Sequence, residues 1–228
     1  MNQDERARFD RALERARRSA YAAGEFVGQE SFMRAGEILS LAAKAGIGPG
    51  VSVLDLCCGV AGPGRFITRE LGCSYLGVDA SPSAIAIARQ RANGVACRFE
   101  VARIPPVPNG PFDVVLLLET VLAFPDKEPL LREISSALRR GGRFAFTLEE
   151  GQPLTEAERA SMPDADTVRL MPLHDMLDCL ERVGLRVRWQ DECTQSHQTM
   201  VDSLIEAFVA DESAIAGQIG RRALDELL

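Results

Sequence analysis

Two acidic residues lie at the ends of short apolar segments, at a spacing that suits binding of a nucleoside. The first segment carries Asp55 and is followed by small residues at Cys57, Gly59 and Gly62. Asp79 ends the second segment, 20 residues after Gly59. Small residues let the backbone turn sharply beside a ligand. A carboxylate in the second position can accept hydrogen bonds from both hydroxyls of a ribose.

The turn between these acids does not fit a dinucleotide. A dinucleotide site needs G-x-G-x-x-G, whose glycines cradle a pyrophosphate. The corresponding residues here are Cys57-Cys-Gly59-Val-Ala61-Gly62, and the strand before them carries Asp55. A carboxylate repels a pyrophosphate but attracts a cofactor that bears an ammonium and a sulfonium. The residues therefore favour S-adenosylmethionine (SAM) over NAD.

The rest of the sequence supplies elements that would position these acids. Apolar segments predict strands at residues 51–57, 75–79, 95–101, 112–118, 143–148 and 185–192. Helical spacing predicts helices in the opening residues, at 30–45 and 65–71, after a Ser81-Pro82 cap, from Asp126 to Gly141-Gly142, before Gly184, and from about Ser196 onward. Residues 149–170 are expected to form a loop or lid. The alternation predicts an α/β, Rossmann-like, doubly wound and mostly parallel sheet.

Length and composition favour one domain over residues 1–228, with a helical cap at 1–48, a Rossmann-like core at 49–193 and a C-terminal helical segment at 194–228. The net charge of −7 argues against a general nucleic-acid surface. The six cysteines lack metal-ligand spacing, and no acidic cluster suggests magnesium, so no metal is expected. The sequence has neither a signal peptide nor an apolar run long enough to span a bilayer, so we expect a cytoplasmic protein.

Four motifs in order carry a resemblance to a known family. They are V-L-D-L-C-C-G-V-A-G at 53–62, G-V-D-A-S at 77–81, F-D-V-V-L-L-L-E-T-V-L at 112–122 and L-R-R-G-G-R-F-A-F at 138–146. With them the chain resembles the class I SAM-dependent methyltransferases, in particular the small-molecule group of ubiquinone/menaquinone-type and natural-product enzymes. The similarity covers roughly residues 30–193. It implies SAM as methyl donor, S-adenosylhomocysteine as product and a small-molecule acceptor.

The resemblance also implies roles for individual residues. Asp55 should contact the methionine end of SAM, often through water, and Gly59 should pass beneath the cofactor. Asp79 should hold the ribose hydroxyls, with Ala80 beside the adenine. The cofactor-binding set is completed by Cys57 and Gly62 in the turn, the backbone near Ala102 and Arg103 at the adenine edge, the Leu118 carbonyl facing the methionine amino group, and Gln29 and Ser31 in an N-terminal lid.

Candidates for catalysis are fewer. His197 follows the last predicted strand and is the favoured general base, because histidine titrates near neutral pH. Glu119 ends the fourth strand, near the expected position of the methyl group. The chain departs from the family in having Ala123 where a histidine is common, and Cys57 and Ala61 where glycine is usual. A seventh strand, usual in the family, is not predicted.

Three alternative functions are left open by the residues. A nucleotide-dependent oxidoreductase would share the fold but would bind NAD(P). A methyltransferase acting on proteins or nucleic acids would show salt-sensitive association with its substrate. A non-catalytic SAM-binding protein would bind the cofactor without turnover. The sequence also leaves a homodimer open.

Overall fold

The computed structural model describes residues 13–162 and 165–221, which form two compact units. One unit is Ser40–Gln190, and the other joins the residues up to Leu39 to those from Asp191 onward. The first residues of the expected opening helix and the last residues of the C-terminal segment lie outside the described ranges. The single domain over 1–228 and its division at residues 48 and 193 stay predictions.

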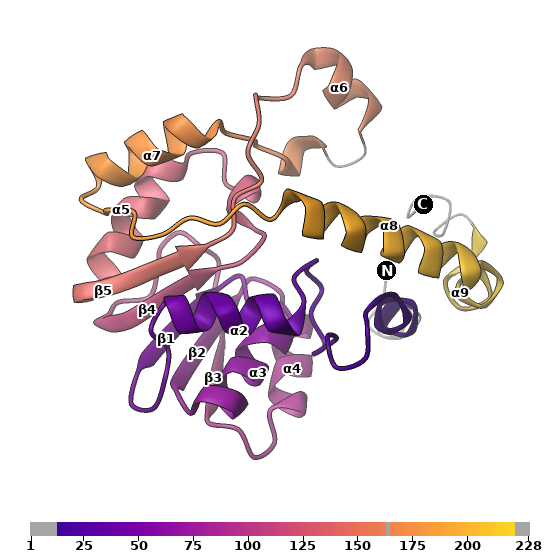
Figure 1. Cartoon of the computed structure of the whole chain (residues 1–228), viewed down its shortest axis with the longest axis horizontal. Helices are drawn as coiled ribbons and strands as arrows, with labels where there is room; N and C mark the ends of the chain where they lie inside the picture. The colour runs from indigo at the N-terminus through magenta and orange to yellow at the C-terminus, as the bar shows by residue number, and fades with distance from the viewer. Residues whose placement is uncertain (1–12, 163–164, 222–228) are drawn as a thin grey trace. The chain divides into compact units, whose positions relative to one another are not determined.

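The unit Ser40–Gln190 is built on a parallel sheet of five strands in the order β3-β2-β1-β4-β5 (Figure 1). The strands are β1 (Ser52–Leu56), β2 (Ser74–Asp79), β3 (Cys97–Val101), β4 (Phe112–Leu117) and β5 (Leu138–Phe146). The helices that alternate with them are α3 (Gly62–Leu71), α4 (Pro82–Arg91), α5 (Lys127–Ala137) and α7 (Leu173–Arg182). The expected α/β Rossmann-like fold is confirmed.

The two faces of the sheet carry different helices. Alternate residues of β1 and β2, such as Leu54 and Val78, join one core cluster with residues of α5 and α7. The residues between them face the other way, toward α3 and α4, which contact β2 and β3. Asp55 and Asp79 belong to this second set, so both acids share the α3–α4 face of the sheet. At β1 the parallel strands β2 and β4 lie on either side, and ligands of such sheets bind at the carboxyl edge.

Local sequence signals explain several boundaries. The Ser81 side chain caps α4 by accepting a hydrogen bond from the Ala84 amide at 3.2 Å, and Pro82 follows it, as expected. Asp126 does occupy the cap position of α5, but its side chain makes no capping hydrogen bond there. Gly72 ends α3 with a φ of 71°.

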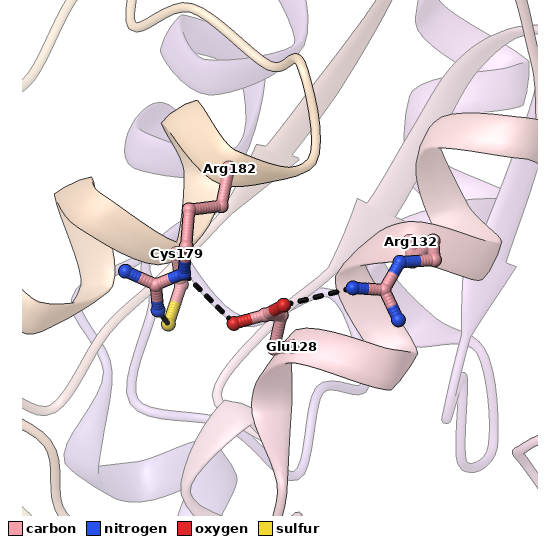
Figure 2. Close-up of polar contacts among 4 residues, drawn as sticks. All are labelled: Glu128, Arg132, Cys179 and Arg182. Carbon is pink, nitrogen blue, oxygen red and sulfur yellow. Dashed lines mark hydrogen bonds and ion pairs between the residues drawn. The ribbon is translucent and has the colours of Figure 1, made fainter.

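An ion-pair network joins α5 to α7 on the outside of their shared core (Figure 2). Glu128 accepts from Arg132 of the same helix at 2.8 Å and from Arg182 of α7 at 2.9 Å. Arg182 also donates to the Cys179 sulfur at 2.9 Å. The hydrogen bond from Arg182 is the largest cause of the lowered pKa of Glu128. The network therefore fixes the spacing of two helices without taking part in the carboxyl edge of the sheet.

The expected end of α5 at Gly141-Gly142 is wrong. The helix ends at Ala137, and both glycines lie inside β5. Leu138 already pairs with Phe112, and a register shift before Val114 takes up the extra residues of β5. Gly141 has a φ of 79°, and a Cβ at Gly142 would approach the Asp113 carbonyl oxygen at 3.0 Å. The glycines thus serve a bulge in the strand rather than a helix end.

The expected sixth strand at 185–192 is also wrong. This segment is irregular, and the described part of the sheet ends at β5. Trp189 lies under the Lys44 ammonium, whose nitrogen is 5.1 Å from the ring centroid, while Val187 is 51% exposed. Alternating apolar residues indicate a half-buried extended segment, but a strand also needs a neighbour to pair with.

The expected loop at 149–170 contains a short helix, α6 (Glu156–Ser161), and a 3₁₀ turn, η2 (Ala165–Thr167). The helix begins with a capping box: the Thr155 hydroxyl accepts from the Glu158 amide at 3.3 Å, and Glu158 accepts from the Thr155 amide at 2.7 Å. T-x-x-E is a recognised start signal, so this helix was readable from the sequence.

The second unit is helical. Residues 13–20 are helical, and α8 (Thr194–Ala210) and α9 (Glu212–Ile219) follow the sheet unit in the chain. The boundary between the units falls within α2 (Ala35–Lys44), the shorter form of the helix expected at 30–45. Tyr21, Met200 and Leu204 form one core cluster of this unit. The helix expected from about Ser196 is confirmed for the described residues by α8 and α9. Within the described ranges, no helix combines the length and apolarity that crossing a bilayer requires.

Candidate functional site

Asp79 organises the turn after β1. Its Oδ2 accepts a hydrogen bond from the Gly59 amide at 2.9 Å, and its Oδ1 accepts one from the Ser81 amide at 2.8 Å. Its backbone carbonyl accepts from the Ala102 amide at 2.9 Å. The strand ends thus bring together three of the residues expected to bind the cofactor, Asp79, Gly59 and Ala102.

The remaining cofactor candidates of this unit lie on the same edge. Ala80 follows Asp79 and is exposed, and Arg103 is an exposed residue next to Ala102. Gly62 is the first residue of α3 and is buried. The Leu118 carbonyl, directly after β4, accepts a hydrogen bond from the Thr120 hydroxyl at 3.2 Å. A carbonyl oxygen has two lone pairs, so Leu118 retains acceptor capacity for a ligand amine.

Asp55 is a buried carboxyl with one hydrogen-bond donor among the residues that the structure describes. It is 4% exposed, and its Oδ2 accepts a hydrogen bond of 2.5 Å from the Tyr75 hydroxyl. Burial raises the pKa of Asp55, the Tyr75 hydrogen bond lowers it, and the nearby charge of Asp79 raises it again, giving about 7. A cation placed beside Asp55 would favour its charged form, which is the electrostatic requirement for holding an ammonium.

The turns at this edge hold three non-glycine residues in left-handed backbone conformation. Cys57 has a φ of 58°, Ala61 of 55° and Glu119 of 52°, and Gly59 between the first two has 53°. A side chain makes this conformation unfavourable by about 1–2 kcal/mol per residue. Such conformations persist where the surrounding fold enforces them, and they cluster at functional sites. The turn thus keeps the glycine conformation at Cys57 and Ala61, where the family usually has glycine.

We expect Ala61→Gly to raise the free energy of unfolding by up to about 1 kcal/mol, because it relieves a left-handed residue. Ala61→Val should lower that energy by more than about 2 kcal/mol, because a β-branched residue is excluded from this conformation and Ala61 is only 1% exposed. Urea denaturation of both variants checks this order. A glycine variant as unstable as the valine variant would show that Ala61 is not strained.

The two adjacent thiols are suited to packing rather than to redox chemistry. Burial, together with the charges of Asp79 and Asp55, raises the pKa of Cys57 to about 12. Burial and the same two carboxylates raise the pKa of Cys58 as well. Both sulfurs are therefore neutral thiols at physiological pH, and a thiol reacts far more slowly than a thiolate. The described residues contain no group of three or more ligand side chains placed to hold a metal ion.

Glu119 is fixed through its backbone. Its amide donates to the Thr147 hydroxyl at 2.5 Å, and the Thr147 amide donates to the Leu117 carbonyl at 3.3 Å. The residue after β5 therefore sets the turn after β4. The catalytic role of Glu119 stays a prediction.

Three candidates belong to the other unit. The Gln29 side chain accepts from the Val27 amide at 2.6 Å and donates to the carbonyls of Glu25 at 3.0 Å and Met33 at 2.8 Å, so its polar atoms hold its own loop together. The Ser31 hydroxyl is buried and has no partner among the residues the structure describes.

His197, the third of them, packs its ring against Phe32, with 4.5 Å between the ring centroids. Its amide donates to the Cys193 carbonyl within the first turn of α8. The proposed roles of Gln29, Ser31 and His197 stay predictions.

Two further residues matter here and were not singled out from the sequence. Tyr75 holds Asp55, as described above. Lys127 is 3% exposed and donates to the carbonyls of Phe124 at 3.0 Å and Arg169 at 2.6 Å, which ties the segment after β5 to the turn after β4. Burial lowers the pKa of Lys127. A tyrosine in an apolar strand and a lysine at a helix start give no signal in a single sequence.

Comparison with known proteins agrees with this geometry. Residues 53–142 match the family model described as a methyltransferase domain. Phosphoethanolamine N-methyltransferase 1 of Arabidopsis thaliana is 34% identical over 108 residues, which are 46% of this chain and 22% of that protein. Methyltransferase GfsG of Streptomyces halstedii is 31% identical over 106 residues, 44% of this chain and 38% of that protein. The matches therefore span less than half of these relatives.

Solved structures extend the likeness in fold to nearly the whole chain. Phosphoethanolamine N-methyltransferase 2 of Haemonchus contortus, in complex with SAM, has a TM-score of 0.76 at 19% identity. The aligned region covers 96% of this chain and 51% of that chain. The [4+2]-cyclase SpnF has a TM-score of 0.73 at 18% identity, and the aligned region covers 96% of this chain and 85% of that chain. Residues 53–142 thus match a methyltransferase domain, and the chain shares the fold of these solved structures.

Proposed function

We propose that this chain transfers a methyl group from SAM to an N, O or C nucleophile of a small molecule. The observation that carries the proposal is the pair of carboxylates at neighbouring strand ends, Asp55 and Asp79, on one face of the sheet. We assign Asp79 to the ribose hydroxyls and Asp55 to the cationic amino-acid end. The names of relatives that act on phosphoethanolamine and on sarcosine or dimethylglycine support a small acceptor.

The sulfonium of bound SAM supplies the electrophilic methyl group, so the protein needs chiefly to bind and align. Asp79 braces the turn through Gly59 and orients the ribose. Asp55 holds the amino-acid end, with the Leu118 carbonyl as a second acceptor. Lys127 fixes the segments after β4 and β5, which flank the expected position of the acceptor. No metal is part of this proposal.

The oxidoreductase alternative is disfavoured by the same residues. A dinucleotide would place its pyrophosphate at the turn after β1, within reach of the charges of Asp55 and Asp79. Likeness in fold alone does not establish methyl transfer, since one structural neighbour is a cyclase. A direct test is therefore required.

Titration calorimetry with SAM, S-adenosylhomocysteine and NADPH tests the cofactor. Saturable binding of the first two without the third is expected. A screen of small amines, phenols and carboxylic acids with radiolabelled SAM then tests transfer, with oligonucleotides and a protein extract as macromolecular acceptors. Label transferred only to macromolecules would refute the small-molecule proposal. Binding without transfer to any acceptor would favour a non-catalytic SAM-binding protein.

His197→Ala tests the proposed base. If His197 accepts a proton from the acceptor, kcat should fall by about 10²-fold or more while SAM affinity changes little. Phe32→Leu is the matched control, because it removes the ring contact of His197 and leaves the imidazole. Unchanged kcat in His197→Ala would remove this residue from the mechanism.

The acidic chain, with a net charge of −7, supports a small-molecule partner rather than nucleic acid. All six cysteines are free. Free thiols persist in reducing compartments, which supports a cytoplasmic location. Sedimentation of the protein would show directly whether two copies associate.

A further inference from the structure

The ring of Tyr75 fills a slot that two glycines keep open. Strand pairing sets Gly77 opposite Asp55 and Tyr75 opposite Val53, so Tyr75 lies two residues from the position paired with Asp55. A Cβ on Gly64 of α3 would lie 2.0 Å from the Tyr75 hydroxyl oxygen. A Cβ on Gly77 would lie 2.9 Å from the Tyr75 ring. A larger residue at Gly64 would displace the hydroxyl, and one at Gly77 would crowd the Tyr75 ring and the Cys58 sulfur.

This slot aims the hydroxyl at one oxygen of Asp55. Tyr75 is 1% exposed, and its edge-to-face contact with Phe99, with centroids 5.9 Å apart, closes the other side of the ring. The hydroxyl donates to Oδ2 of Asp55 at 2.5 Å. No described residue donates to Oδ1 of the same carboxyl. One oxygen is therefore fixed by the protein, and the other retains its acceptor capacity for a ligand.

We propose that Tyr75 is a positioning residue for the amino-acid end of the cofactor, because it holds the Asp55 carboxylate in the orientation that an ammonium requires. This inference rests on the proposed function, since it needs SAM at the carboxyl edge of the sheet. It assigns a role to a residue that contacts the ligand only through Asp55.

The charges around Asp55 give the proposal a pH dependence. The ionisable groups coupled to it are the Tyr75 hydroxyl and Asp79 of β2, with the thiols of Cys57 and Cys58 in the turn and of Cys97 in β3. The packed strand β4 presents uncharged Leu116, and α3 presents uncharged Gly64 and carries Arg65, which donates to the Ala61 carbonyl at 3.2 Å. Burial raises the pKa of Tyr75 well above its usual value, so its hydroxyl stays a donor.

Without the Tyr75 hydroxyl, the pKa of Asp55 should rise above its present value of about 7. A larger fraction of the carboxyl would then be protonated at neutral pH, and no hydroxyl would fix its orientation. A cationic ligand group would lose its partner, whereas a ligand that lacks this group would be unaffected.

The test compares two ligands by calorimetry in wild type and Tyr75→Phe. S-adenosylhomocysteine carries the amino-acid end, and 5′-methylthioadenosine lacks it. At pH 7 the variant should bind S-adenosylhomocysteine about tenfold more weakly, with less than about a twofold change for methylthioadenosine. At about pH 8.5 the loss for S-adenosylhomocysteine should shrink, because Asp55 regains its charge.

Thr68→Val is the matched control. It removes a buried hydroxyl that donates to the Gly64 carbonyl at 2.8 Å, close to the slot but without contact to Asp55. A comparable fall in Tm with unchanged affinity for both ligands is expected. Equal weakening of both ligands by Tyr75→Phe would mean a merely structural role and would overturn the inference.

If Tyr75→Phe does not fold, the test is the pH dependence of ligand binding by the wild-type protein. Its affinity for S-adenosylhomocysteine should rise between about pH 5.5 and 8, and that for methylthioadenosine should not. A flat profile for both ligands overturns the inference but leaves the proposed function standing. Binding of neither ligand at any pH overturns the proposed function and the inference with it.

Discussion

Asp79→Ala should weaken SAM binding by at least about tenfold, because it removes the carboxylate proposed to accept hydrogen bonds from both ribose hydroxyls. The same change leaves the amides of Gly59 and Ser81 without their acceptor, so the turn after β1 loses its brace. Calorimetry with SAM gives the affinity. The SAM affinity of Asp79→Asn, which keeps the shape of the side chain, should lie between those of wild type and Asp79→Ala.

Asp113→Ala is the matched control for this prediction. Asp113 is also a strand carboxylate that accepts backbone and side-chain hydrogen bonds, from the Ser52 amide and hydroxyl at 2.7 Å each, and it pairs with Arg139. It lies at the opposite end of the strands, near the start of β1 and β4. Its loss should lower stability without changing SAM affinity. Unchanged affinity in Asp79→Ala, with the fold intact, would refute the ribose role.

Asp55→Asn should make the protein more stable at alkaline pH and poorer at binding SAM. The pKa of Asp55 in the folded chain, about 7, exceeds its usual value of 3.8. Between those pH values the folded chain keeps a proton that the unfolded chain has lost. The resulting stabilisation is present below about pH 4 and is lost as the pH rises through about 7.

Three pKa units correspond to about 4 kcal/mol. This gain is reduced because the amide of asparagine also needs a hydrogen-bond partner. We therefore expect the unfolding free energy at pH 8 to increase by about 2 kcal/mol. Little gain is expected at pH 4. SAM affinity should fall by at least about tenfold, since the ammonium loses its counter-charge. Urea denaturation at both pH values, with calorimetry at pH 8, measures the two effects.

The opposite pH dependence is expected for Asp113→Asn. Hydrogen bonds from Ser52 lower the pKa of Asp113, so its contribution is present near neutral pH and is lost in acid. This variant should be less stable than wild type at pH 8, with the difference shrinking in acid. If Asp55→Asn were destabilising at pH 8, Asp55 would not be a costly buried charge in the free protein, and the electrostatic account of this site would be wrong.

The sequence by itself determined the order along the chain of the five strands of the sheet and the place of both acids. Apolar segments alternating with helical spacing are sufficient to indicate a parallel sheet, because each strand must be buried on both faces. Acids at strand ends then meet at one edge, which is why Asp55, Gly59, Asp79 and Ala102 were predictable as neighbours. The capping signals at Ser81 and Thr155 are equally local.

The tertiary structure alone decided the features that depend on contacts between distant segments. The segment at 185–192 has the pattern of a strand but no partner, and Gly141-Gly142 resembles a helix end but lies in a bulge that only the pairing with β4 creates. The Tyr75 slot needs Gly64 and Gly77 from two different elements. The pKa of Asp55 depends on burial and on Asp79, and both arise only when the strands assemble. Spacing along a chain encodes local geometry, whereas pairing, burial and electrostatic coupling are properties of the assembled fold.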